Sequence, residues 1–152
     1  MMNKEKKKAY ISEMTSEFDK SEAVIVTHYQ GLTVNQLDEL RAKMREHGII
    51  FKITKNRITK LALEKTRCKD LSDLFSGPTA VALSEDAITS AKILTNFSKE
   101  NKSLKILGGI MGNDILDVAG VKNVATLPTL DEARTKIVGI LRSPAQKVAS
   151  IL

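Results

Sequence analysis

A strand that turns sharply into a helix is encoded in residues 23–36, AVIVTHYQGLTVNQ. Residues 23–26 are apolar and mostly β-branched, which is typical of a strand buried on both faces. Gly31 permits a tight turn. Thr33 and Gln36 have the spacing of a capping box, in which both side chains bind free backbone N–H groups at the start of a helix. The segment therefore predicts a strand-turn-helix unit.

Strand and helix patterns alternate on both sides of this unit. Apolar periodicity predicts helices over residues 4–20, 86–100 and 117–122, and a helix capped by Asn56 that ends near Thr66. Short apolar runs predict strands over 49–54, 79–83 and 104–110, with a bulge or close backbone approach at Gly108-Gly109. This order favours one α/β or α+β domain with about four strands, over residues 1–125.

Residues 126–152 have a different character. Pro128 breaks the chain, and Thr129 with Glu132 forms a second capping box. Apolar residues then recur at helical spacing, with a restart at Ser143-Pro144. We predict a C-terminal amphipathic helical segment, which either packs on the domain or is offered to a partner helix.

Positive charge is concentrated in the middle of the chain. The 152 residues include 24 Lys and Arg against 18 Asp and Glu, a net charge of +6. Residues 41–69 hold ten of these cations and two acids, Glu46 and Glu64, a net of +8 (ten minus two). Such clustering indicates a surface for a polyanion such as nucleic acid. The alternative is a solvated face that keeps the protein soluble.

Candidates for catalysis, metal binding or membrane insertion are few. The glycine-rich run 108–112 lacks the Gly-Lys-Ser/Thr of a phosphate-binding loop. Cys68 is the one cysteine, and His28 and His47 lack metal-ligand spacing. No apolar run approaches the roughly 18 residues of a membrane span. We predict a cytoplasmic protein with no enzymatic activity, cofactor or metal; a small phosphate-binding enzyme is the outside alternative.

Two strand-to-helix turns carry the candidate nucleic-acid site. Tyr29–Thr33 offers an aromatic ring, an amide and backbone donors, and Lys55–Arg57 occupies the next such turn. If the two strands are neighbours, both turns lie at one edge of the sheet, where Arg41 and Arg45 could extend the surface. Aromatic residues make up 4% of the chain and Trp is absent, so recognition of a folded RNA by shape and backbone fits better than a base-stacking platform.

Five stretches resemble the bacterial ribosomal protein L-ten family, in matching order and spacing over essentially the whole chain. They are YQGLTV (29–34), the helix pattern with Leu37, Leu40-Arg41, Met44-Arg45 and Gly48, KNRI (55–58), FSGPT (75–79) and ATLPT (125–129).

The resemblance implies a ferredoxin-like N-terminal domain that binds large-subunit ribosomal RNA at the stalk base, beside protein L-eleven. It also implies that residues 126–152 dock dimers of the acidic stalk protein L-twelve, which recruit translational GTPases. Members can also bind and repress their own messenger. The implied RNA contacts are Gln30, Gly31, Thr33, Arg41, Arg45, Lys52, Lys55, Asn56 and Arg57. The implied partner contacts are Ile137, Ile140, Leu141, Val148 and Leu152.

The chain departs from the family pattern in two places. Members often carry Arg at the position of Gln30. The chain also stops at Leu152, sooner than a helix with several docking elements, of which residues 143–149 resemble one. We expect fewer docked dimers or a C-terminal end that is cut short. A relative that acts in ribosome assembly and turnover, without docking the stalk protein, is the alternative function.

Overall fold

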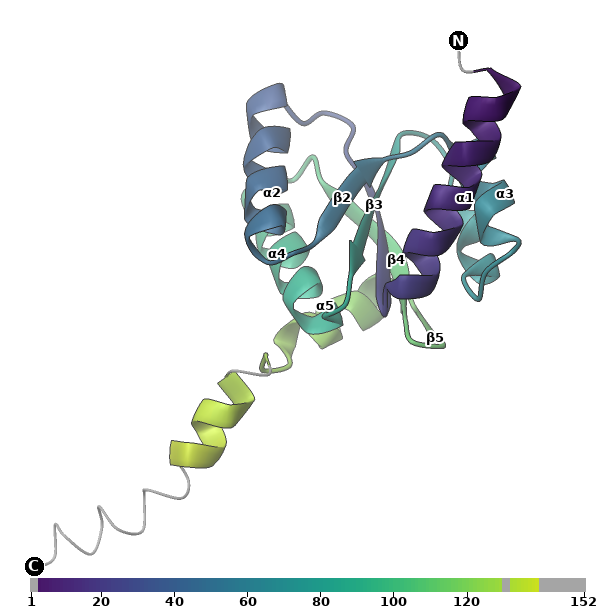
Figure 1. Ribbon diagram of the computed structural model, residues 1–152. Coiled ribbons are helices and arrows are strands. Elements are labelled where there is room, and N and C mark those ends of the chain that lie inside the picture. Colours follow the sequence, from purple (N-terminus) through teal and green to yellow (C-terminus); the bar gives the residue numbers. More distant parts are fainter. Residues whose placement is uncertain (1–2, 130–131, 140–152) are drawn as a thin grey trace, which may run out of the picture.

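The computed structural model describes residues 3–129 and 132–139 (Figure 1). Its helices are α1 (Lys4–Lys20), α2 (Val34–Glu46), α3 (Asn56–Leu63), the 3-10 helix η1 (Lys69–Leu74), α4 (Ala87–Glu100) and α5 (Val118–Thr126). Its strands are β1 (Ala23–His28), β2 (Ile50–Ile53), β3 (Thr79–Ser84), β4 (Lys105–Met111) and β5 (Asp114–Leu116).

The five strands form one antiparallel sheet in the order β2-β3-β1-β4-β5. Within it, β1-α2-β2-β3-α4-β4 follows the β-α-β-β-α-β order of a ferredoxin-like domain. The predicted α+β class is therefore confirmed. The segment α3-η1 is inserted between β2 and β3, and β5-α5 follows the last strand of the unit.

The structure departs from the predicted elements at three places. Helix α5 continues to Thr126, past the predicted end near residue 122. The sheet has a fifth strand, β5, where the sequence suggested a turn at Asn113-Asp114. With three residues it is too short for a period-2 pattern, and its pairing with β4 defines it instead. Helix α3 ends at Leu63 rather than near Thr66. The Thr66 hydroxyl and N–H both bind the Leu63 carbonyl, which closes a turn in place of another helical residue.

The sheet separates two hydrophobic cores. On one face Val24 and Val26 pack with residues of α1, α3 and η1. On the other face Ile25 packs with residues of α2, α4 and α5. Strand β1 is buried along almost its whole length because helices cover both of its faces, as its apolar sequence predicts.

The predicted bulge at Gly108-Gly109 is confirmed. The pairing of β1 with β4 shifts register, so that Val26 lies opposite Gly108 but Thr27 lies opposite Ile106. A Cβ atom on Gly109 would lie 2.5 Å from the Val24 carbonyl oxygen. The close backbone approach therefore explains this glycine without any ligand.

The C-terminal segment begins with the predicted capping box. The Glu132 N–H donates to the Thr129 hydroxyl over 3.3 Å, and the Thr129 N–H donates to the Glu132 carboxylate over 3.1 Å. Residues 132–139 are helical and point away from the sheet (Figure 1). Ile137 is 58% exposed. The four other implied partner contacts lie outside the described residues, namely Ile140, Leu141, Val148 and Leu152. No helix in the described part is both long and apolar enough to cross a membrane.

Candidate nucleic-acid interface

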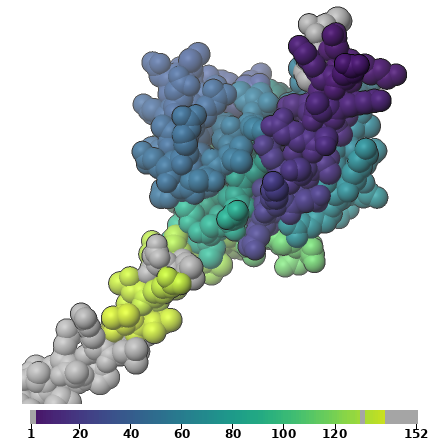
Figure 2. All heavy atoms as spheres, viewed as in Figure 1, coloured from purple at the N-terminus to yellow at the C-terminus, as the bar shows by residue number. Residues whose placement is uncertain are grey.

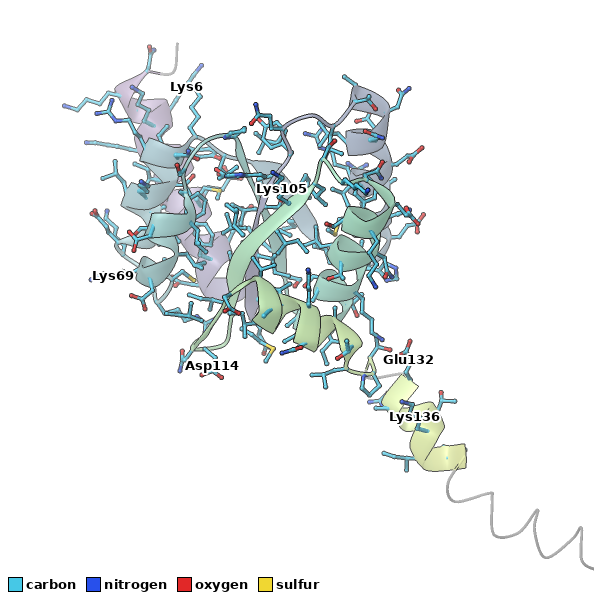
Figure 3. All side chains as sticks on the ribbon, turned by 180° about the vertical axis from the view of Figure 1, so that it is seen from behind. Lys6, Lys69, Lys105, Asp114, Glu132 and Lys136 are labelled. Atoms are coloured by element: carbon cyan, nitrogen blue, oxygen red, sulfur yellow. The ribbon has the colours of Figure 1, made fainter. Side chains whose placement is uncertain are left out.

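The two strand-to-helix turns lie at one end of the sheet, although not for the reason that the sequence suggested. Strands β1 and β2 are not neighbours, because β3 lies between them. Both are antiparallel to β3, so they run in the same direction and their C-terminal ends lie at the same end of the sheet. Figure 3 labels Lys6 on α1 and Lys105 at the start of β4 toward this end of the molecule, and Asp114 and Glu132 toward the opposite end.

The first turn is held by its own side chains. Gly31 has a φ of +94°, and a Cβ there would lie 3.2 Å from the Ser103 hydroxyl, so glycine is required. Thr33 caps α2 through the predicted capping box: its hydroxyl accepts from the Gln36 N–H, and its own N–H donates to the Gln36 amide. Gln30 is exposed at the tip. Gly31 and Thr33 therefore have structural roles in presenting this turn.

The second turn corrects a prediction. Asn56 does not cap α3; it is the first residue of the helix, after Lys55, which makes no side-chain cap. The Asn56 amide instead donates to the Gly77 carbonyl over 2.8 Å and accepts from the Thr79 hydroxyl. The side chain therefore bonds to two residues more than 20 positions away instead of to the backbone of its own helix. Asn56 thus fixes the start of β3 against α3, while the first N–H groups of α3 have no side-chain cap.

Six of the nine implied RNA-contact residues line two hollows, whereas the three of the first turn, Gln30, Gly31 and Thr33, line neither. Lys55, Asn56 and Arg57 line the strand-end cavity, of about 670 Å³, which no pattern in the sequence indicated. Arg41, Arg45 and Lys52 line the β2 groove, of about 630 Å³, which runs over the edge strand between α1 and α2 (Figure 2). Ile53 lines the groove and the next residue, Thr54, lines the cavity, so both hollows reach the end of β2.

The cations that line these hollows differ in how strongly they are paired with carboxylates of the protein itself. The Lys52 ammonium lies 2.7 Å from a Glu17 carboxylate oxygen and 3.3 Å from one of Glu13. Burial alone would lower the pKa of Lys52, but the hydrogen bonds and charges of these two carboxylates outweigh it and raise the pKa. Its charge is therefore largely neutralised by α1, which the sequence could not reveal because these residues are 35 and 39 positions apart.

The arginines and Lys55 are more available. Among the residues that the structure describes, Arg41 has one ion pair, a long contact of 3.8 Å with Asp38 on the same helix. Arg45, Lys55 and Arg57 form no ion pair with any carboxylate in residues 3–129 and 132–139. Exposed cations without internal partners are free to bind an external anion.

Two further residues of the strand-end cavity were not among the implied contacts. Lys7 reaches it from the first turns of α1, and Tyr29 lines it from the end of β1. The lysine run at residues 6–8 could have indicated a contact with an anion, but not that α1 would begin beside α3.

The fold and the surface together define a class, namely a small basic α+β protein built around a cationic surface. Among the described residues, no three His, Cys, Asp or Glu side chains are grouped to hold a metal ion. Cys68 is buried in the core, and burial raises the pKa of its thiol, so it is not an activated nucleophile.

Comparison with known proteins identifies the family. Residues 2–99 match the family model described as Ribosomal protein L10. The large ribosomal subunit protein uL10 of Pelagibacter ubique is 71% identical over 151 residues, which cover 99% of this chain and 91% of that protein. The uL10 protein of Rhodospirillum rubrum is 47% identical over 150 residues, 99% of this chain and 87% of that protein. The chain belongs to the ribosomal protein L10 family.

Membership settles several expectations. The resemblance seen in the sequence is confirmed, and it extends over nearly the whole chain. Members of this family are structural components of the ribosome and not enzymes, as predicted. As a ribosomal protein, the chain works in the cytoplasmic ribosome.

Proposed function

We propose that this protein binds large-subunit ribosomal RNA at the stalk base, beside protein L-eleven, and anchors dimers of the acidic stalk protein L-twelve that recruit translational GTPases. The RNA-binding surface consists of the strand-end cavity and the β2 groove. The anchoring segment consists of residues 126–152.

One observation carries the RNA-binding part. Arg45 of α2 lines the β2 groove, Lys55 and Arg57 at the start of α3 line the strand-end cavity, and none of the three has a carboxylate partner within the described residues. Each phosphate contact made by such a cation releases condensed counterions, so affinity falls as salt rises. The family assignment agrees with this proposal, because a ribosomal protein is surrounded by ribosomal RNA, which is a polyanion.

Affinity for a stalk-base rRNA fragment, measured by fluorescence anisotropy at several salt concentrations, tests this assignment. Arg57→Ala and Arg41→Ala should each weaken binding and reduce the slope of log affinity against log salt by about one. The matched control is Lys122→Ala, which removes one exposed charge from α5, away from both hollows. A flat salt dependence, or an equal loss in the control, would contradict RNA binding at this surface.

The exposed apolar residue on the C-terminal helix supports the anchoring part. The sequence places an apolar stripe at Ala133, Ile137, Ile140 and Leu141. Ile137 is 58% exposed, so this part of the stripe is not covered by the domain. An uncovered apolar stripe on a helix is the usual docking surface for a partner helix.

The mass of the complex formed with purified acidic stalk protein tests this part directly. Ile137→Asp should reduce the number of bound dimers, because it places a charge on the stripe. Val138→Asp is the matched control: Val138 is 48% exposed but lies about 100° around the helix from Ile137, off the stripe. A full complement of dimers on Ile137→Asp, or no complex with the unmodified chain, would refute the anchoring role.

A further inference from the structure

The part of the first turn that lines neither hollow lies against another turn. This is the α4–β4 turn, residues 101–104, which is closed by a 3.1 Å hydrogen bond from the Leu104 N–H to the Asn101 carbonyl. Asn101 follows the last residue of α4, and Lys105 begins β4. Because β4 is antiparallel to β1, the α4–β4 turn lies at the end of the sheet where β1 ends.

Two contacts join these turns. The Gln36 amide nitrogen donates to the Asn101 side-chain oxygen over 2.7 Å, while the amide oxygen of Gln36 accepts from the Thr33 N–H over 3.0 Å. A Cβ on Gly31 would lie 3.2 Å from the Ser103 hydroxyl, so the backbone of the first turn runs directly against the α4–β4 turn. The cap of α2 needs only the oxygen of Gln36. Its nitrogen ties the cap to a residue 65 positions away and holds the two turns as one unit.

The α4–β4 turn brings two lysines beside the first turn. Lys102 is the second residue of the turn, Lys105 lies opposite His28 in the register of the sheet, and both lysines are exposed (Figure 3). Neither forms an ion pair with a carboxylate of the described residues. Residues 28–37 and 101–113 contain no Asp or Glu, so nothing within the two turns offsets the two positive charges.

The surroundings of these lysines favour an external anion. Glu100 is the nearest acid along the chain, and it is already paired with Lys43 at 3.6 Å. Loops on a protein surface are usually more mobile than the elements they connect, and ordering a loop on binding costs entropy. The bond between Gln36 and Asn101 fixes the turns before a ligand arrives, so less of this cost remains for binding.

We propose that the joined turns form a further contact surface for the RNA backbone, in which Lys102 and Lys105 bind phosphates. Gln36 and Asn101 act as positioning residues that hold the two turns together. This inference rests on the proposed function and extends the RNA-binding surface from the strand-end cavity across the end of β1 to the start of β4. Neither lysine is among the RNA contacts that the family resemblance implies, and neither lies in the cationic stretch 41–69.

The contacts are tested with Lys102→Ala and Lys105→Ala in the anisotropy assay with the stalk-base rRNA fragment. Each should reduce the slope of log affinity against log salt by about one, and the double variant should reduce it by about two. Lys122→Ala is the matched control, which removes one exposed charge from α5 and should leave the slope unchanged. All three side chains are exposed, so the melting temperatures should stay the same, which separates binding from folding.

Two substitutions of Asn101 test the positioning role. Asn101→Ala removes the acceptor of the Gln36 amide and should weaken binding about fivefold, the effect of one lost hydrogen bond. This loss should be equal at every salt concentration, because no phosphate contact is removed. Asn101→Asp keeps an acceptor for Gln36 but adds a negative charge next to Lys102. Its loss of affinity should be largest at low salt and should shrink as salt screens the charge.

The possible failures are distinguishable. If Arg57→Ala reduces the salt slope but Lys102→Ala and Lys105→Ala do not, the further contact surface is refuted and the RNA-binding proposal stands. If Asn101→Ala melts at a lower temperature but binds the fragment as tightly as the unmodified chain, Asn101 has only a structural role. Equal affinity of Asn101→Asp and the unmodified chain at low salt would also contradict RNA near Lys102. If the unmodified chain does not bind the fragment, both proposals fail.

Discussion

Replacing Gly109 by Ala should destabilise the protein more than the same replacement at an open glycine such as Gly112. A Cβ at position 109 would lie 2.5 Å from the Val24 carbonyl oxygen and 3.1 Å from the Ile25 Cα. Both contacts are with the backbone of β1, which cannot rotate away as a side chain can. Strand β1 is also hydrogen-bonded to β3 on its other edge and covered by helices on both faces.

The size of the effect follows from the displacement required. To bring the closest contact to 3.0 Å, which real Cβ atoms seldom go below, β1 and β4 must separate by about 0.5 Å. Overpacking of a core usually costs about 1–3 kcal/mol, and we expect the upper end here, about 3 kcal/mol, because the obstruction is backbone. At about 2–4 °C per kcal/mol for a chain of this length, the melting temperature should fall by about 6–12 °C.

Thermal denaturation followed by circular dichroism measures this change. The matched control is Gly112→Ala: this glycine has a φ of +64° but nothing within 4 Å of an added Cβ. It should cost only the strain of a left-handed backbone, roughly 1–2 kcal/mol. If Gly109→Ala melts within 2 °C of the unmodified protein, or above Gly112→Ala, then β1 and β4 can separate at little cost and steric conflict with the backbone does not explain Gly109.

Three further predictions concern single groups. Thr33→Ala should lower the free energy of unfolding by about 1 kcal/mol in urea titrations, since α2 loses its cap; an unchanged midpoint would count against the capping box. Burial raises the pKa of the Cys68 thiol, so a thiol reagent at pH 8 should react only when the chain opens, and immediate reaction would contradict the burial. A hydrogen bond from Lys92 lowers the pKa of Glu132; the resulting stabilisation is present at neutral pH and is lost as the pH falls through the folded pKa. Carboxyl NMR titration should give a pKa below that of glutamate in a peptide, and an equal value would rule out the interaction.

Local signals in the sequence were reliable where a structure depends on neighbouring residues. The capping boxes at Thr33 and Thr129 each involve residues three positions apart, so the motif contains the whole interaction. The double burial of β1 follows in the same way from its continuous apolar run. The glycine pair in β4 indicated a bulge or a close backbone approach, because glycine otherwise weakens a strand and two in succession are seldom found there.

Contacts between distant residues could not be predicted. Asn56 has the properties of a helix cap, but Gly77 and Thr79 take its amide. Lys52 has the properties of an RNA contact, but two carboxylates of α1 pair with it. The strand-end cavity brings together residues from the beginning of the chain to position 79, so no motif could contain it. The RNA and partner contacts themselves stay predictions.

The end of the sheet with the strand-end cavity faces away from the end where residues 132–139 leave the domain (Figures 1 and 3). A ligand at one pole therefore touches nothing that a ligand at the other pole touches. Coupling between binding events requires an element that changes with both, and a sheet packed on two sides is a poor candidate for that element. The domain should consequently hold the two binding sites apart without coupling them, so the affinity measured at one end should not change when the other end is occupied.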